Sequence, residues 1–178
     1  MAILPIRTFP DPVLRTRARE VGNVTDDHLR LVKNMIDTMR DAPGVGLAAP
    51  QIGILERIFV WEVEDRYGAV IDPVIVDRSD QMAEDEEGCL SLPGLLFPVV
   101  RNARVVVEGK DETGGPLRIE ADDLLARVIQ HEIDHLDGVL FTDRLHEALK
   151  REAMTILREQ ALGFATGRRT PPPVEERL

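Results

Sequence analysis

The chain has 178 residues, of which 43% are hydrophobic and 30% charged. These values are ordinary for a globular domain that buries a core without help from disulfides. The formal net charge is −10, from 22 Lys and Arg against 32 Asp and Glu. Such a balance argues against broad electrostatic binding of nucleic acid, because phosphates need a positive surface.

The cysteine content and the apolar segments indicate the compartment of the protein and whether it enters a membrane. Cys89 is the single cysteine, so no intramolecular disulfide can form, which is consistent with a reducing compartment. No apolar run approaches membrane-spanning length, and the first residues lack the pattern of a signal peptide. We therefore expect a soluble, cytoplasmic protein with no membrane partner and no specificity for nucleic acid.

The first half of the chain predicts one helix followed by strands. Residues 11–12, Asp-Pro, can begin a short helical turn. Residues 25–41 predict a helix, because apolar side chains recur every three or four positions after a threonine N-cap. Residues 57–63 predict a strand, and residues 69–76 predict one or two more, interrupted by a proline. The acidic segment 77–87 predicts a surface loop.

The second half predicts a hairpin and two helices. Residues 103–109 and 117–120 are apolar segments on either side of a Gly-Gly turn, which is typical of a hairpin. A helix is predicted over about 122–137, with Gly138 positioned to end it, and it is apolar around much of its circumference. A third helix, of mixed charge, is predicted over about 144–162.

The order of these elements indicates an α+β fold, because the strands form a block with helices before and after it. We predict antiparallel and mixed β-sheets packed around a buried central helix at 122–137, followed by a C-terminal helix. Residues 1–165 are predicted to form a single domain. Residues 166–178 are Pro-rich and charged, which predicts a disordered tail.

The pentad His-Glu-Ile-Asp-His at 131–135 is the strongest functional signal. His131 and His135 are one helical turn apart and project from one face, so both imidazoles can hold one divalent metal. Glu132 lies beside them, close enough to act on a water molecule. Apolar neighbours place this helix in the interior, where imidazoles without a partner are costly. The pentad therefore predicts a hydrolytic metal site with the HExxH motif, not a solvated helix face.

The pattern leaves alternatives for the third protein ligand of the metal. Phe141 stands where the longer HExxHxxGxxH pattern needs a histidine, which excludes that class of protease. A later glutamate, Glu147, Glu152 or Glu159, is compatible with the spacing. Cys89 is the better candidate, because a thiolate is a strong ligand and glycine and proline surround this cysteine in a polar loop.

A third segment, Gly-Val-Gly-Leu-Ala-Ala-Pro-Gln at 44–51, contains a GxGxxA string. It is a weak signal for dinucleotide binding, because a helix precedes it and Pro50 prevents a helix after it. Glycines that let the main chain approach a ligand explain the segment better. Gln51 would then offer its amide N–H to an oxyanion.

These three segments together resemble the peptide deformylase family. The resemblance lies in residues 44–51, 87–91 (Glu-Gly-Cys-Leu-Ser) and 130–138 (Gln-His-Glu-Ile-Asp-His-Leu-Asp-Gly), in that order, and it covers most of residues 1–165. Enzymes of this family remove the formyl group from the N-terminal methionine of nascent polypeptides and release formate. The resemblance thus implies a catalytic metallohydrolase domain whose partners are formyl-methionyl nascent peptides.

The resemblance also implies a ligand set and a metal. Cys89, His131 and His135 would bind one divalent ion per chain, and Glu132 would be the general base and acid. Iron(II), Fe2+, is the usual native metal of the family, and Zn2+ or Ni2+ often replaces it in preparations. The same donors suit all of these ions.

Further roles follow from the same resemblance. The side chain of Gln51 and the backbone N–H of Leu90 would stabilise the oxyanion. The first three residues of segment 44–51 would lie alongside the substrate main chain, as a neighbouring strand does. Apolar side chains would form the slot for the methionine. The predicted substrate-binding residues are Gly44, Val45, Gly46, Leu124 and Val128.

Two regions differ from some members of the family, and they concern the preference for peptide residues beyond methionine and contact with the ribosome. Some members carry an arginine several residues after the motif cysteine, where this chain has Leu95 and Leu96, so the preference for peptide residues beyond methionine is open. Some members also contact the ribosome through a basic C-terminal helix. Lys150, Arg151 and Arg158 would allow a transient ribosome contact, but interspersed glutamates favour an ordinary solvated face.

Two other classes of function are compatible with part of the pattern. A metallopeptidase would use a distant carboxylate in place of Cys89 and would cleave unformylated peptides. A metal-stabilised binding protein would have no turnover with any metal. The presence of both Glu132 and Gln51 argues against the second class.

Overall fold

The computed structural model describes residues 2–163. The helices in this range are α1 (Asp26–Asp41), α2 (Asp123–Leu136) and α3 (Glu147–Ala161). The strands are β1 (Gly46–Ala48), β2 (Ile58–Val63), β3 (Arg66–Arg78), β4 (Met82–Glu87), β5 (Phe97–Asn102), β6 (Arg104–Lys110) and β7 (Pro116–Asp122). Short 3-10 helices lie at Pro12–Arg15 (η1), Ala49–Ile52 (η2) and Phe141–Asp143 (η3).

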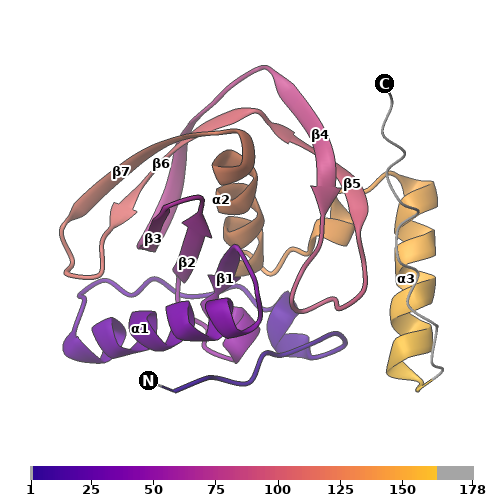
Figure 1. Cartoon of the computed structure of the whole chain (residues 1–178), viewed down its shortest axis with the longest axis horizontal. Helices are drawn as coiled ribbons and strands as arrows, with labels where there is room; N and C mark the ends of the chain where they lie inside the picture. Colours follow the sequence, from indigo (N-terminus) through magenta and orange to yellow (C-terminus); the bar gives the residue numbers. More distant parts are fainter. Residues whose placement is uncertain (1, 164–178) are drawn as a thin grey trace.

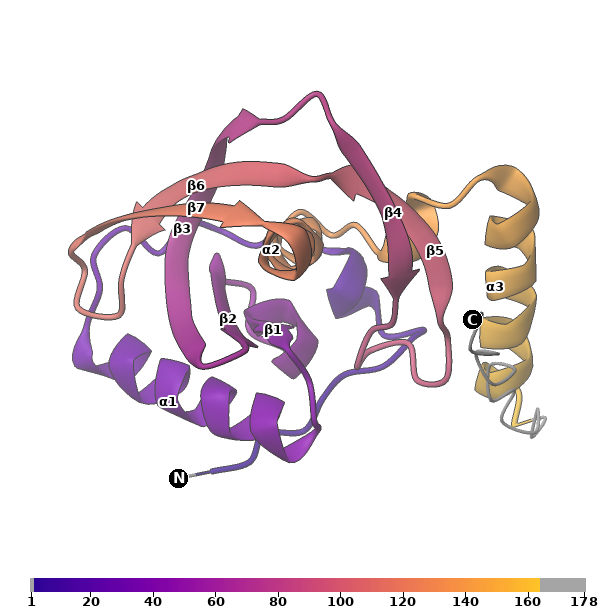
Figure 2. The same cartoon turned by 45° about the horizontal axis from the view of Figure 1, so that its top comes forward.

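The strands form two separate sheets around helix α2. The larger sheet has the strand order β1-β2-β3-β6-β7, and β4 and β5 form a two-stranded ribbon. Every strand pair is antiparallel. Figure 1 shows α2 between the larger sheet and the ribbon, with α1 along one side and α3 at the edge of the molecule. Figure 2 looks nearly along α2 and shows strands on several sides of it. The predicted α+β fold with a central helix is confirmed.

Helix α2 is buried because its sequence is apolar on most sides. Asp123 stands in its first turn, where a carboxylate is favoured by the helix dipole, and Gly138 follows its end with a positive φ of 72°. Ile129 and Leu136 are fully buried in a core shared with the larger sheet. The prediction of a helix over about 122–137 is therefore accurate to one residue at each end.

The predicted surface loop at 77–87 is wrong. Met82–Glu87 form strand β4, which pairs along its whole length with β5. Five consecutive residues of β4 are exposed, so both faces of the strand meet water and the usual alternation of apolar and polar residues is missing. The polar composition of β4 reflects its exposure to water and gives no sign of a strand. The strand forms because it pairs with β5, which begins ten residues after β4 ends.

Strand β3 continues through the proline that was expected to interrupt it. The ladder with β6 shifts register between Ile71 and Val74, so Pro73 lies in a bulge. Asp72 has a φ of 52°, and its carboxylate accepts hydrogen bonds from the N–H groups of Val21 and Gly22. One long strand therefore replaces the two short ones that the proline allowed.

The remaining elements agree broadly with expectation. The predicted helix over 25–41 is α1, the predicted hairpin is β6–β7, and the predicted helix over about 144–162 is α3. Helix α3 packs through buried Ala153 and Leu157. No helix among residues 2–163 is long and apolar enough to cross a bilayer. The predicted tail at 166–178 lies outside the described residues, and the single domain over 1–165 stays a prediction.

The core around α2 predicts the effect of shortening one of its side chains. Ile129→Ala should lower the free energy of unfolding by about 2–5 kcal/mol, because the side chain is fully buried and leaves a cavity. Urea denaturation followed by circular dichroism measures this loss. Leu29→Ala, at a 40% exposed position on α1, is the control and should cost less than about 0.5 kcal/mol. Equal losses for both variants would contradict the central position of α2.

Candidate metal centre and active site

The two histidines of the pentad lie on one face of α2, one turn apart. Their ring centroids are 4.9 Å apart and the rings are nearly perpendicular, at 71°. His135 is fully buried, and His131 lies at the edge of the cavity described below. The helix alone is responsible for this arrangement, because residues four apart in an α-helix are neighbours on its surface.

Cys89 completes the group from a different part of the chain. It lies in the turn after β4, and its Sγ is 3.2 Å from Nε2 of His135. The ligand atoms of Cys89, His131 and His135 all lie within 4.8 Å of one another. Within residues 2–163 this is the one group of three His, Cys, Asp or Glu residues so arranged. Two imidazoles and a thiolate in a largely buried site fit a divalent metal with an open coordination position.

The pKa values of the two imidazoles diverge. Burial lowers the pKa of His131, but hydrogen bonds to Cys89 and Glu87 outweigh burial, and the pKa lies well above its usual value. Burial, together with the neighbouring His131, lowers the pKa of His135 well below its usual value. His135 is therefore neutral, as a ligand must be. A metal at this place would displace the proton from His131, because metal binding requires the free ring nitrogen.

Glu132 is buried directly beneath Gly46 of β1. Burial raises the pKa of Glu132 to about 7, and its Oε2 has no hydrogen-bond partner among the described residues. A cation held by the neighbouring histidines would lower this pKa again, because an opposite charge favours the carboxylate. A Cβ on Gly46 would lie 2.8 Å from Cδ of Glu132. Only a glycine therefore leaves room for the carboxylate at this point of β1.

The side chain of Gln51 is held in one orientation by the protein. Its Oε1 accepts the backbone N–H of Ala48 at 2.8 Å, so its Nε2 must be the end that faces the ligand group. This nitrogen donates to Oγ of Ser91 at 3.1 Å and lies 3.6 Å from Sγ of Cys89. Gln51 is 1% exposed. The structure thus presents an oriented amide donor beside the candidate metal ligands.

A cavity of about 470 Å³ opens above these groups. Its lining includes Cys89, His131 and Glu132, together with Gln51 and Leu90. The five predicted substrate-binding residues line it as well: Gly44, Val45, Gly46, Leu124 and Val128. The three sequence motifs therefore meet at one cavity, formed by β1, the turn after β4, and α2.

Comparison with known families identifies the group to which this arrangement belongs. Residues 3–151 match the family model described as polypeptide deformylase. The peptide deformylase of Acidothermus cellulolyticus is 51% identical over 159 residues, which cover 89% of this chain and 88% of that protein. The chain belongs to the polypeptide deformylase family.

Solved structures of deformylases share the fold. The peptide deformylase of Thermus thermophilus matches with a TM-score of 0.85 and 45% identity, over 91% of this chain and 97% of the other. The enzyme from Ehrlichia chaffeensis in complex with actinonin matches with a TM-score of 0.86 and 36% identity, over 90% and 98% of the two chains.

Family membership confirms the resemblance carried by the three motifs, and with it the prediction that the chain is a deformylase, a metal-dependent hydrolase. The alternative prediction, a metallopeptidase that uses a distant carboxylate as third ligand, is not supported. Its candidate ligands, Glu147, Glu152 and Glu159, lie on α3, and none of them belongs to the candidate ligand group.

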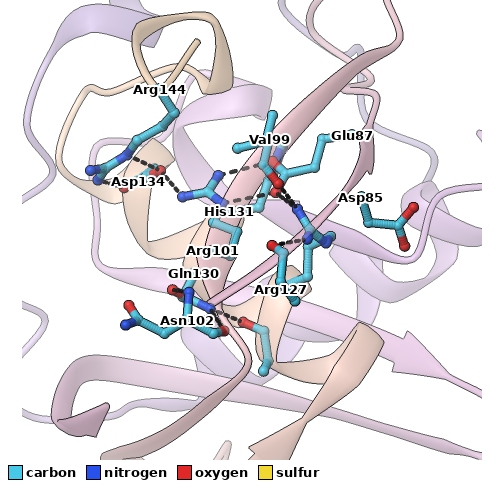
Figure 3. A network of polar contacts seen from close by, with 12 residues as sticks. Asp85, Glu87, Val99, Arg101, Asn102, Arg127, Gln130, His131, Asp134 and Arg144 are labelled. Carbon is cyan, nitrogen blue, oxygen red and sulfur yellow. Dashed lines mark hydrogen bonds and ion pairs between the residues drawn. The ribbon is translucent and has the colours of Figure 1, made fainter. Parts of the chain in front are cut away.

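The deformylase site rests on a buried ionic network that sequence reasoning missed (Figure 3). Glu87 Oε2 lies 2.9 Å from Nδ1 of His131. Both oxygens of Glu87 accept hydrogen bonds from Arg101, at 2.8 and 2.9 Å, and Oε1 also accepts one from Arg127 at 2.8 Å. Arg101 reaches Asp134 of α2 at 2.6 Å. A second arginine, Arg144, also binds Asp134.

Both carboxylates of this network lie inside the sequence motifs, where a signal for them existed. Glu87 begins the segment 87–91, and Asp134 is the fourth residue of the pentad. A carboxylate in a buried motif needs a cation. The chain has many arginines, however, and the spacing does not indicate that Arg101 or Arg127 is the partner.

The contact between Gly46 and Glu132 yields a test of the site. Gly46→Ala should lower the rate of formate release from a formyl-methionyl peptide on the order of 100-fold, because displacing a catalytic group by about 1 Å costs this much. Formate release is measured together with bound metal, which should stay near one ion per chain. Gly68→Ala is the control, since its Cβ would meet Trp61 at 3.3 Å, outside the cavity. Wild-type activity of Gly46→Ala would refute the close packing against Glu132.

Proposed function

We propose that Cys89, His131 and His135 bind one divalent metal ion, and that the chain uses it to hydrolyse the N-formyl group of formyl-methionyl nascent peptides. The supporting observation is the meeting of these three ligand atoms, within 4.8 Å of one another, with Glu132 and Gln51 at one cavity. Membership of the deformylase family supports the same reaction.

Glu132 is proposed to move the proton. When bound, the divalent ion acts as a Lewis acid and lowers the pKa of water toward neutrality. Glu132 accepts the proton of the attacking water at its free Oε2 and passes it to the leaving nitrogen of the peptide. Its position next to His131 in the sequence keeps this carboxylate beside the ligand group without making it a ligand.

Gln51 and Leu90 are proposed to stabilise the developing oxyanion. Nε2 of Gln51 has two hydrogens, of which one goes to Oγ of Ser91 and the other makes only a long contact of 3.6 Å with Sγ of Cys89. This second hydrogen is proposed to turn to the formyl oxygen when the substrate binds. The backbone N–H of Leu90 has no acceptor among the described residues, and Leu90 lines the same cavity. Loss of one such donor typically lowers the rate by about 100- to 1,000-fold.

The free edge of β1 is proposed to align the main chain of the substrate. The carbonyl of Val45 accepts the N–H of Glu62 in β2, so the backbone of Val45 points into the sheet. Backbone groups alternate in direction along a strand, and those of Gly46 therefore point outward, toward the cavity. Because β1 is the edge strand, an extended peptide can pair with it.

The methionine side chain is proposed to enter the apolar part of the cavity. Leu124 and Val45 are 48% and 46% exposed, and with Val128 they line the cavity. Large apolar side chains left exposed around a concave site favour an apolar ligand group. Leu95 is buried in the core that packs against α3, whereas Leu96 is exposed. Neither supplies a charge for peptide residues beyond methionine.

We propose Fe2+ as the native ion, with Zn2+ or Ni2+ as substitutes that the same three donors accept. Anaerobic purification followed by elemental analysis should find about one iron per chain. Exposure to air should then lower both the iron content and the formate release, and reloading with Ni2+ should restore activity. A protein that carries only zinc under strict anaerobic conditions, at full activity, would contradict iron as the native metal.

A transient contact with the ribosome stays a prediction. On α3, Arg151 pairs with Glu147 at 3.1 Å, and Lys150 lies 3.8 Å from Asp143. Both cations are thus partly neutralised by acidic neighbours, which supports an ordinary solvated face over a basic docking surface.

Replacing Glu132 tests the proposed reaction. Glu132→Gln should keep about one metal per chain, because the ligands are unchanged, and should lose at least about 100-fold in formate release from formyl-Met-Ala, the typical effect of removing a general base. Cys89→Ala, in contrast, should lose the metal as well as the activity. Retained turnover in Glu132→Gln, or retained metal in Cys89→Ala, would count against the assigned roles.

A further inference from the structure

The candidate metal site is divided between two parts of the molecule that share no sheet. His131 and His135 lie on α2, whereas Glu87 ends strand β4 and Cys89 follows two residues later. Strands β4 and β5 pair only with each other, in a sheet separate from the five-stranded sheet. The spacing between the ligands therefore depends on side chains that join the ribbon to α2.

Arg127 is such a side chain, and its contacts reach both strands of the ribbon (Figure 3). Its Nη1 donates to Oε1 of Glu87 and to the backbone carbonyl of Val99 in β5, both at 2.8 Å. Its Nη2 donates to the carbonyl of Ala83 in β4 at 2.9 Å. Arg127 is 7% exposed, so these bonds are made largely out of water, where they are strong.

The position of Arg127 on α2 explains why it acts on His131. The two residues are four apart, and therefore adjacent on one face of the helix. Glu87 accepts from Arg127 at Oε1 and lies against Nδ1 of His131 with Oε2. A carboxylate that holds the second nitrogen of a histidine orients its ring toward a metal. Arg127 thus fixes the carboxylate that fixes the imidazole.

Arg101 also binds the carboxylate of Glu87, but it belongs to the ribbon and not to α2. It belongs to β5, so its two bonds to Glu87 lie within the ribbon, and it reaches α2 through Asp134. Only the planar guanidinium of arginine presents several donors in fixed directions. Arg127 uses two nitrogens for one carboxylate and two carbonyls on two strands, whereas a lysine has all its donors on one rotatable ammonium.

We propose that Arg127 is a positioning residue of the metal site, which holds the β4–β5 ribbon in place against α2 and sets metal affinity through Glu87. This inference rests on the proposed function, because it takes Cys89, His131 and His135 as the metal ligands. Arg127 lines the same cavity, and its hydrogen bonds go to Glu87 and two backbone carbonyls, not to the three proposed ligands.

The test measures the affinity for Zn2+ of the metal-free protein by competition with a chelating dye. Arg127→Met should weaken Zn2+ binding by about 10- to 100-fold, the range typical for partners that orient a ligand. Arg127→Lys keeps the charge and should show a smaller loss. Lys110→Met is the matched control, since Lys110 also joins a carboxylate and a carbonyl, those of Asp72 and Gly22, but away from the site. This control should leave Zn2+ affinity unchanged.

A double-mutant cycle separates action through Glu87 from general loosening of the structure. In the Glu87→Gln background, Arg127→Met should weaken Zn2+ binding much less than in the wild type, because the carboxylate it positions is gone. Fully additive losses would overturn the proposal, and so would an unchanged Zn2+ affinity in folded Arg127→Met. If Arg127→Met does not fold, Arg127→Lys is compared in the same cycle and decides by the same criteria.

The outcome is distinguishable from a failure of the proposed function. Formate release by the wild type, combined with equal Zn2+ affinity in wild type and Arg127→Met, overturns the role of Arg127 alone. A wild type that binds Zn2+, Ni2+ and Fe2+ but releases no formate contradicts the proposed function. In that case, a weaker Zn2+ affinity of Arg127→Met still supports the positioning role of Arg127.

Discussion

The charge of one buried carboxylate, that of Glu87, constrains the rest of the structure. Taking an ion out of water costs several kcal/mol unless it is paired, and Glu87 is only 5% exposed. Burial raises its pKa, but the hydrogen bonds from Arg101 and His131 outweigh burial and hold the pKa well below its usual value. Because Glu87 stays ionised, Arg101, Arg127 and His131 must converge on it. The ribbon, the central helix and a proposed metal ligand are thereby joined at one point.

A second constraint is the close approach of backbone to side chain at β1. Gly46 lies against the carboxylate of Glu132, while the outer edge of the same strand is unpaired within the described sheet. One short strand thus has two uses. It leaves space for the proposed general base on one face, and it presents main-chain groups to an extended peptide at its edge. Glu86 and Glu87 of the ribbon line the same cavity, so the shape of the cavity also depends on the contacts that join the ribbon to α2.

Fold prediction succeeded where the signal was local and failed where it was not. Helices α1 and α2 were predictable because apolar residues repeat at helical spacing, and the β6–β7 hairpin because a Gly-Gly turn separates two apolar segments. Strand β4 escaped prediction because its residues are charged and exposed. Strand β5 escaped because nothing in its own sequence identifies β4 as its partner. Pro73 suggested a break in β3, yet a bulge accommodates it within one continuous strand.

The same division applies to the site. The residue pattern alone predicts that His131 and His135 share one face with Glu132 beside them, because helical periodicity dictates that geometry. The residue pattern offered Cys89 and Gln51 as candidates, and the family resemblance supported their roles, but the meeting of their atoms with the two histidines depends on tertiary structure. The pairing of Glu87 with Arg101 and Arg127 was decided by tertiary structure entirely. Any of the chain's many arginines can neutralise a carboxylate, and burial in a particular packing selects which ones do.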